Sequence, residues 1–261
     1  MYQERDRDIR YIEDRGKNGY GMGLGIILLD MTFPGFPGDV RNPSAHGYPI
    51  QYEVARGLDI ENLVLHPEDP ANLDAILQAA KNLERMGCKA VLAECGYFAW
   101  YQKDVAAAVD IPVLMSSLLQ VSWASQLIGP EKTVGLFMSM KKSFREEYLK
   151  RLGMPPGVNY VVGGAMDGGE CTQFTRLWGF DEKRTEPAAA EYETAEAEFV
   201  RTGAQFYREH ADMGAMVLEC TGFPPFARAL QREIGIPVFS WGTLMDFAYS
   251  VVVHRSYYGH M

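Results

Sequence analysis

A short motif occurs twice in this 261-residue chain, and the parts of the motif keep the same spacing. The sequence E-C-G-Y-F at 94–98 is followed by I-P-V at 111–113, and E-C-T-G-F at 219–223 is followed by I-P-V at 236–238. Each shared residue is offset by 125 positions, as from 94 to 219 and from 111 to 236. A constant offset is typical of duplicated units. We therefore expect two similar halves related by a pseudo-twofold axis.

Apolar runs and stretches of helical periodicity alternate along the chain. The predicted strands are 25–30, 89–93, 111–115, 133–138, 159–162, 215–218 and 236–239. The predicted helices are 72–85, 98–109, 142–152, 187–210, 226–233 and a last one from residue 244. Strands that alternate with helices favour mostly parallel sheets with helices on both faces.

The predicted fold class is therefore α/β, with two pseudo-symmetric Rossmann-like halves and the active site in the crevice between them. We assign residues 1–118 plus 243–261 to an N-terminal half that carries Cys95. Residues 119–242 form a C-terminal half that carries Cys220.

Cys95 and Cys220 each follow an apolar strand and precede a predicted helix. The carboxyl end of a strand is where open α/β folds bind ligands. The N-terminus of the following helix would lower the pKa of the thiol. Across the pseudo-twofold axis the sulfurs would face one cavity about 7 to 10 Å apart, one as thiolate base and the other as thiol acid. Of the other cysteines, Cys171 is expected in a loop and Cys88 in the packing of the core.

The chain resembles the aspartate/glutamate racemase superfamily over residues 20–256. That superfamily includes amino-acid and hydantoin racemases, maleate cis-trans isomerase and arylmalonate decarboxylase. Its members have a cysteine after a strand in each of two α/β halves, and the matching residues here are Cys95 and Cys220. The resemblance implies a racemase or isomerase without a cofactor, acting at a carbon next to a carboxylate or amide. Gly96 and Tyr97 depart from the Cys-Asn-Thr sequence that is common in amino-acid racemases, so free aspartate or glutamate is not a secure substrate.

Further residues are candidates for substrate binding. Arg41, in the Pro/Gly-rich loop 33–49, would clamp a carboxylate, with a solvated surface arginine as the alternative. The other candidates follow the cysteines or end strands: Gly96, Tyr97, Phe98, Ser116, Ser117, Ser139, Thr221 and Gly222. Helix capping is the alternative for the serines, and core packing is the alternative for Phe98.

Two acidic residues precede the cysteines. Alternation along a strand predicts that Glu94 and Glu219 point away from the thiols.

Composition narrows the range of partners. The formal net charge of −9 argues against a nucleic-acid partner. No apolar run is long enough for a membrane span, and the first residues lack the apolar centre of a signal peptide, so a cytoplasmic protein is expected. No metal-ligand spacing occurs. The expected partners are a small carboxylate or hydantoin-like substrate and further copies of the chain in a homo-oligomer.

Two other functions remain open. A cis-trans isomerase of an unsaturated diacid would add one cysteine covalently to the double bond. A small-molecule binding protein would keep the fold without the activity.

Overall fold

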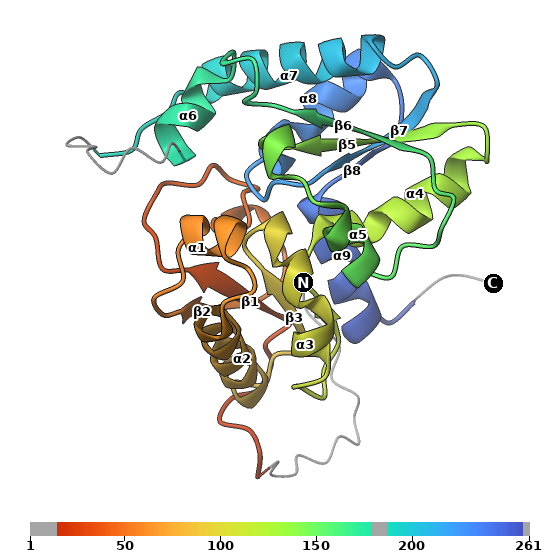
Figure 1. Cartoon of the computed structure of the whole chain (residues 1–261). Coiled ribbons are helices and arrows are strands. Elements are labelled where there is room, and N and C mark those ends of the chain that lie inside the picture. Colours follow the sequence, from red (N-terminus) through yellow and green to blue (C-terminus); the bar gives the residue numbers. More distant parts are fainter. Residues whose placement is uncertain (1–14, 179–186, 258–261) are drawn as a thin grey trace.

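The computed structural model describes residues 15–178 and 187–257, and Figure 1 shows two α/β halves stacked one on the other. One half contains a four-stranded sheet of order β2-β1-β3-β4, and the other contains a sheet of order β6-β5-β7-β8. Every pair of neighbouring strands is parallel. The two sheets thus repeat one topology, which confirms the predicted two-half α/β fold.

The strands are short and mostly buried. In the first sheet they are β1 (Leu24–Leu29), β2 (Ile50–Ala55), β3 (Ala90–Ala93) and β4 (Val113–Leu114). In the second sheet they are β5 (Thr133–Met138), β6 (Tyr160–Gly164), β7 (Met213–Leu218) and β8 (Val238–Phe239).

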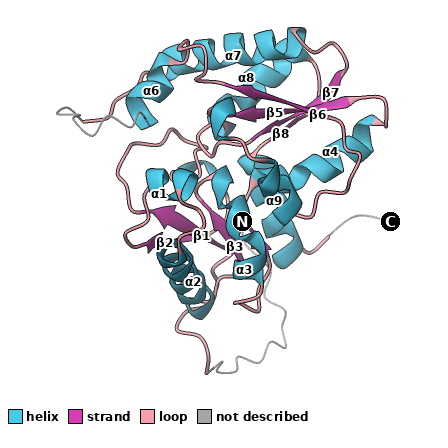
Figure 2. Cartoon of the chain, in the orientation of Figure 1, coloured by secondary structure: helices cyan, strands magenta, loops and turns pink. Residues whose placement is uncertain are grey.

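Helices cover both faces of each sheet (Figure 2). The α-helices are α1 (Ile60–Leu65), α2 (Pro70–Arg85), α3 (Gln102–Ala106), α4 (Gln120–Ile128), α5 (Glu146–Arg151), α6 (Thr172–Trp178), α7 (Tyr192–Arg208), α8 (Pro224–Ile234) and α9 (Trp241–Val252). Short 3-10 helices are η1 (Pro43–Ala45), η2 (Gly96–Tyr101), η3 (Ser117–Leu119) and η4 (Lys141–Ser143). In the first half, α2 packs on β1 and β2, and α9 returns from the end of the chain to pack on β1 and β3. In the second half, α4 packs on β5 and β7, while α7 and α8 pack together over the second sheet.

Several local predictions differ from the structure. The predicted helix 98–109 is instead the 3-10 helix η2 followed by the short α3, and the predicted helix 142–152 is divided into η4 and α5. Elements β2, α1, α4 and α6 were not predicted. Strand β2 pairs only with β1, and most of its residues are half-buried. An edge strand of this kind lacks the continuous apolar run by which a buried strand is found.

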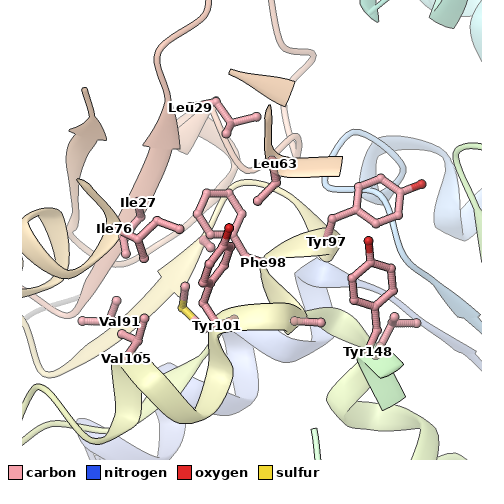
Figure 3. Packing of buried hydrophobic residues seen from close by; sticks show 14 of the residues in the cluster. Ile27, Leu29, Leu63, Ile76, Val91, Tyr97, Phe98, Tyr101, Val105 and Tyr148 are labelled. Atoms are coloured by element: carbon pink, nitrogen blue, oxygen red, sulfur yellow. The ribbon is translucent and has the colours of Figure 1, made fainter. Parts of the chain in front are cut away.

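One hydrophobic cluster extends from the first sheet into the second half, where it includes Tyr148 of α5 (Figure 3). Ile27 of β1, Val91 of β3 and Phe98 of η2 are fully buried in this cluster. Tyr97 packs beside Tyr148, with ring centroids 5.6 Å apart. Phe98 is therefore a core residue, as its alternative interpretation predicted.

We expect Ile27→Val to lower the free energy of unfolding by about 0.5 to 1.5 kcal/mol, because it removes one methylene from a fully buried site while keeping a β-branched side chain. Urea denaturation measures this change. Val251→Ala on the half-exposed surface of α9 is the control and should change stability by less than about 0.5 kcal/mol. Equal effects of both substitutions would contradict the assigned core.

Within residues 15–178 and 187–257, no helix is long and apolar enough to cross a membrane.

Candidate active site

The two copies of the repeated motif meet at the carboxyl ends of β3 and β7. Cys95 opens η2 two residues after β3 ends, and Cys220 lies two residues after β7 ends. Both cysteines line one cavity of about 80 Å³ between the halves. One water needs about 10 to 15 Å³ of such space. The cavity can therefore hold a small organic molecule, and residues from both halves contact that space.

Hydrogen bonds join the halves around this cavity. Thr221 donates from its hydroxyl to the backbone carbonyl of Glu94. The hydroxyls of Tyr97 and Ser139 are 3.1 Å apart and hydrogen bonded. Within the second half, the backbone N–H of Ser139 donates to Glu219 at 3.2 Å, which links the Tyr97 contact to the second motif copy. These bonds fix the two motif copies relative to one another.

The rest of the wall is mostly apolar. Its apolar and aromatic residues are Leu29, Met31, Phe33, Ile60, Val64, Met140, Met166 and Trp178. Its polar residues are Glu94, Cys95, Tyr97, Ser139, Glu219, Cys220 and Thr221. Phe33 comes from the Pro/Gly-rich loop 33–49. The low polarity means that any charge inside the cavity is poorly solvated.

The thiols are not activated in the way that the sequence predicted. Burial raises the pKa of Cys95 well above its usual value, and the charge of Glu219 raises it further. The same two causes, in the same order, raise the pKa of Cys220. Backbone N–H groups of Tyr97 and Gly96 oppose the shift at Cys95, but Cys95 opens a 3-10 helix and α8 begins four residues after Cys220. The expected lowering of the thiol pKa is therefore wrong.

The two glutamates line the cavity, so the prediction that they point away from the thiols is also wrong. The regular strands end at Ala93 and Leu218, one residue before each glutamate. Beyond the last strand residue, alternation no longer fixes the direction of a side chain. Glu94 and Glu219 thus stand beside both cysteines on the cavity wall.

Arg41 is bound inside the protein by Glu94. Its Nε and Nη2 donate to the two carboxylate oxygens of Glu94, the latter bond at 2.9 Å. It also donates to the carbonyls of Met31 and Leu29, and its guanidinium lies 4.2 Å above the ring centre of Phe33. Arg41 does not line the cavity. The structure therefore gives this arginine the role of neutralising Glu94, and its predicted clamping of a substrate carboxylate has no support from this geometry.

Glu219 occupies the position equivalent to Glu94 but has a different environment. Glu219 is 1% exposed, and its Oε1 has no hydrogen-bond partner in the described part of the chain. Among residues 15–178 and 187–257, no lysine, arginine or histidine forms an ion pair with it. Burial raises its pKa to about 7, against the opposing effect of the backbone N–H groups of Ser139 and Gly96.

The remaining predicted residues divide between the cavity and its support. Tyr97, Ser139 and Thr221 line the cavity. Ser116 accepts a hydrogen bond from the N–H of Leu118 as a cap of η3, and Ser117 donates to the carbonyl of Leu218 at 2.8 Å. Ser116 therefore has the capping role that the alternative interpretation gave it, whereas Ser117 has a structural role that was not predicted, a hydrogen bond to the end of β7.

Two glycines allow close packing next to the motif. A Cβ atom at Gly96 would meet the carboxyl of Glu219, and one at Gly222 would meet the ring of Trp178. These glycines support the wall without forming part of it.

The two other cysteines lie outside the cavity. Cys88 is fully buried in the core of the first half. Cys171 precedes α6 in a loop but is also buried, and its sulfur is 3.6 Å from the hydroxyl of Thr202. Both are absent from the cavity wall.

No group of three or more His, Cys, Asp and Glu side chains within the described ranges is arranged to hold a metal ion.

We expect Glu219→Gln to remove a pH dependence of stability. A carboxyl whose pKa is raised by folding binds its proton more tightly in the folded state, so stability falls as pH rises from about 4.5 to about 7. The loss attributable to Glu219 is up to about 3 kcal/mol. Urea denaturation at pH 5 and pH 8 should therefore show a smaller difference for the variant than for the wild type. A variant that keeps the full pH dependence would contradict the assigned environment of Glu219.

Several solved structures share the fold of this chain. The chain aligns with the Gly74Cys mutant of arylmalonate decarboxylase at a TM-score of 0.58 and 15% identity, over 88% of this chain and 92% of that one. An aspartate racemase homologue from Pyrococcus horikoshii OT3 aligns at 0.55 and 19% identity, over 88% and 98% of the two chains. Glutamate racemase RacE1 from Bacillus anthracis aligns at 0.55 and 14% identity, over 89% and 81%. The chain therefore has the fold of the aspartate/glutamate racemase superfamily, as the resemblance predicted.

The sequence relatives are lyases. The chain is 28% identical over 230 residues to a dimethylsulfoniopropionate lyase of Durusdinium sp. clade D, covering 86% of this chain and 73% of the relative. It is 27% identical over 225 residues to dimethylsulfoniopropionate lyase 3 of Emiliania huxleyi (strain CCMP1516), covering 83% of this chain and 56% of the relative. The chain thus spans little more than half of the Emiliania protein. No family model matches the chain.

Proposed function

We propose that this protein is a carbon–sulfur lyase that cleaves a β-sulfonium carboxylate of the dimethylsulfoniopropionate type. The observation that carries the proposal is the joint placement of both motif cysteines on one buried, largely apolar cavity. Similarity to dimethylsulfoniopropionate lyases over most of the chain supports the substrate class. The shared fold supports chemistry at a carbon next to a carboxylate, because racemases and arylmalonate decarboxylase act at such a carbon.

The proposed reaction is a β-elimination. A thiolate at one cysteine removes a proton from the carbon next to the carboxylate. The electrons of that C–H bond form the C=C bond, and the bond from the β-carbon to sulfur breaks. The electron pair of that bond leaves with the sulfur as neutral dimethyl sulfide, and acrylate remains. The second thiol donates a hydrogen bond to the substrate carboxylate while negative charge builds up on it.

The positive charge of a sulfonium substrate would stabilise the thiolate. Burial and the charge of Glu219 raise the pKa of both thiols. A positive charge close to a thiol favours its charged form. A sulfonium centre in the cavity therefore lowers the pKa of the thiols, so the base forms when a substrate of the correct charge is bound.

Racemisation of an amino acid, hydantoin or related acid is the second candidate function. It is favoured by the equivalent positions of Cys95 and Cys220 on a single cavity, since proton transfer to either face of one carbon needs two bases. Cis-trans isomerisation of a diacid has less support. A diacid brings two negative charges, and the nearby cation, Arg41, is already paired with Glu94.

Product analysis tests the proposal. The protein is incubated with dimethylsulfoniopropionate, and dimethyl sulfide is measured in the headspace by gas chromatography. The expected result is one dimethyl sulfide per acrylate. A parallel set of chiral amino acids and hydantoins is followed by circular dichroism. Racemisation of one of these compounds without release of dimethyl sulfide would reject the lyase function and support the racemase function.

A further inference from the structure

The duplication has placed two glutamates around one cavity, and only one of them is neutralised. Glu94 accepts from the N–H of Leu29 at 2.7 Å and from two nitrogens of Arg41. Its negative charge is therefore paired, and both of its oxygens are hydrogen bonded.

Glu219 has neither form of compensation. One carboxyl oxygen accepts from the N–H of Ser139, and Oε1 has no hydrogen-bond partner among residues 15–178 and 187–257, although Glu219 is only 1% exposed. The N–H of Gly96 lies near the carboxyl and lowers its pKa, but it forms no hydrogen bond with Oε1. A buried polar atom without a partner is costly, and such atoms are rare in folded proteins. An unpaired carboxyl on the wall of a ligand-sized cavity therefore indicates that the ligand supplies the missing partner.

The surroundings of Glu219 suit a cation. The cavity wall contains the aromatic rings of Tyr97, Trp178 and Phe33 and a series of apolar side chains. Faces of aromatic rings attract quaternary cations, and a carboxylate in an apolar setting attracts them more strongly than one in water. A second anionic group would be repelled there.

We propose that Glu219 is the specificity-determining residue of the cavity: its unpaired carboxylate binds the positive centre of the substrate and so selects zwitterions over carboxylates without a positive centre and over dianions. The choice of probe molecules rests on the proposed function, because they resemble its substrate. The charge selectivity itself is a property of binding and does not require the lyase reaction.

Binding of a cation is then linked to the proton on Glu219. Burial raises the pKa of this carboxyl to about 7, so a fraction of the protein carries the proton on Glu219 at neutral pH. A bound cation favours the ionised carboxylate and releases that proton. Affinity for a cation therefore rises with pH up to about 7 and levels off above it. The other titratable or charged groups around the cavity are Glu94, Arg41, Asp39, Cys95, Cys220, Tyr97 and Tyr148.

Isothermal titration calorimetry with two unreactive probes tests this proposal. The probes are 3-(trimethylammonio)propionate and 4,4-dimethylpentanoate, which have the same shape and differ in the single positive charge. At pH 8 the wild type should bind the cationic probe at least about tenfold more tightly. The variant Glu219→Gln should bind both with similar affinity. The control Glu61→Gln, an exposed carboxyl on α1 near the cavity, should keep the wild-type preference.

A second measurement needs only the wild-type protein, so it holds even if the variant folds poorly. Titrations at pH 6.5 in buffers of different ionisation enthalpy should show release of a fraction of one proton per 3-(trimethylammonio)propionate and none for 4,4-dimethylpentanoate. Equal affinity for the two probes in the wild type, failure to bind the cationic probe, or a preference that survives in Glu219→Gln would overturn the assignment. Selective binding of the cationic probe by a protein that releases no dimethyl sulfide would leave the assignment intact and reject only the proposed lyase.

Discussion

Replacing Cys95 or Cys220 by alanine is expected to lower the turnover of dimethylsulfoniopropionate by about 10²- to 10⁴-fold. A positioned base contributes about 10²- to 10⁴-fold to a rate, and loss of one donor to a developing oxyanion costs about 10²- to 10³-fold. Both thiols line the cavity, and duplication has placed them at equivalent strand ends. The measurement is the initial rate of dimethyl sulfide release by the purified variants.

The two remaining cysteines provide matched controls for this prediction. Cys88→Ala and Cys171→Ala remove thiols of the same type from buried positions outside the cavity. Their rates should stay near that of the wild type, although each substitution leaves a small void and lowers stability. Wild-type turnover in either Cys95→Ala or Cys220→Ala would show that the mechanism with two thiols is wrong. If racemisation is the true reaction, each variant should lose it but exchange the α-proton of opposite enantiomers with solvent.

Replacing Arg41 by methionine is expected to lower the free energy of unfolding by about 3 to 5 kcal/mol, because it leaves the buried charge of Glu94 without its cation. Burial already raises the pKa of Glu94. Without Arg41 the folded state binds a proton at Glu94 still more tightly, so the loss should be larger at pH 8 than at pH 5. Urea denaturation at the two pH values measures both effects.

The double variant Arg41→Met/Glu94→Gln is the control for this second prediction. It removes both charges, so it should recover part of the lost stability, and the two substitutions should be strongly non-additive. Replacing a solvent-exposed arginine would change stability little and would be additive with Glu94→Gln. Arg41→Met with unchanged stability, or with a double variant no more stable than Arg41→Met alone, would contradict the pairing of Arg41 with Glu94.

The repeated motif made the architecture predictable, while the local elements were predictable only where burial is complete. The strand 133–138 was predicted at the residues of β5, all of which are buried. The half-buried edge strand β2 was missed, and the helix expected after Cys95 is a 3-10 helix. Apolar and alternating sequence patterns reflect how deeply a strand is buried, so they identify central strands well. They carry little information on how a turn begins after a strand ends.

The sequence predicted the two cysteines at the centre of the candidate site, but it did not predict how the charged residues around them are paired. The offset of 125 residues identified Cys95 and Cys220, which line one cavity. The roles of Arg41 and Glu219 could not be read from the sequence, because they depend on which acidic residue the arginine reaches after the loop 33–49 has folded. The motif makes Glu94 and Glu219 look equivalent. Only the three-dimensional arrangement shows that one is paired and the other is not.

Proton NMR of the protein with dimethylsulfoniopropionate in heavy water tests the central claim most directly, since it follows the carbon next to the carboxylate and the carbon–sulfur bond together. The account predicts that acrylate and dimethyl sulfide appear in equal amounts, and that Cys95→Ala and Cys220→Ala produce both about 10²- to 10⁴-fold more slowly than the wild type. Substrate that stays intact with folded wild-type protein, with no acrylate and no deuterium at the carbon next to the carboxylate, would contradict it.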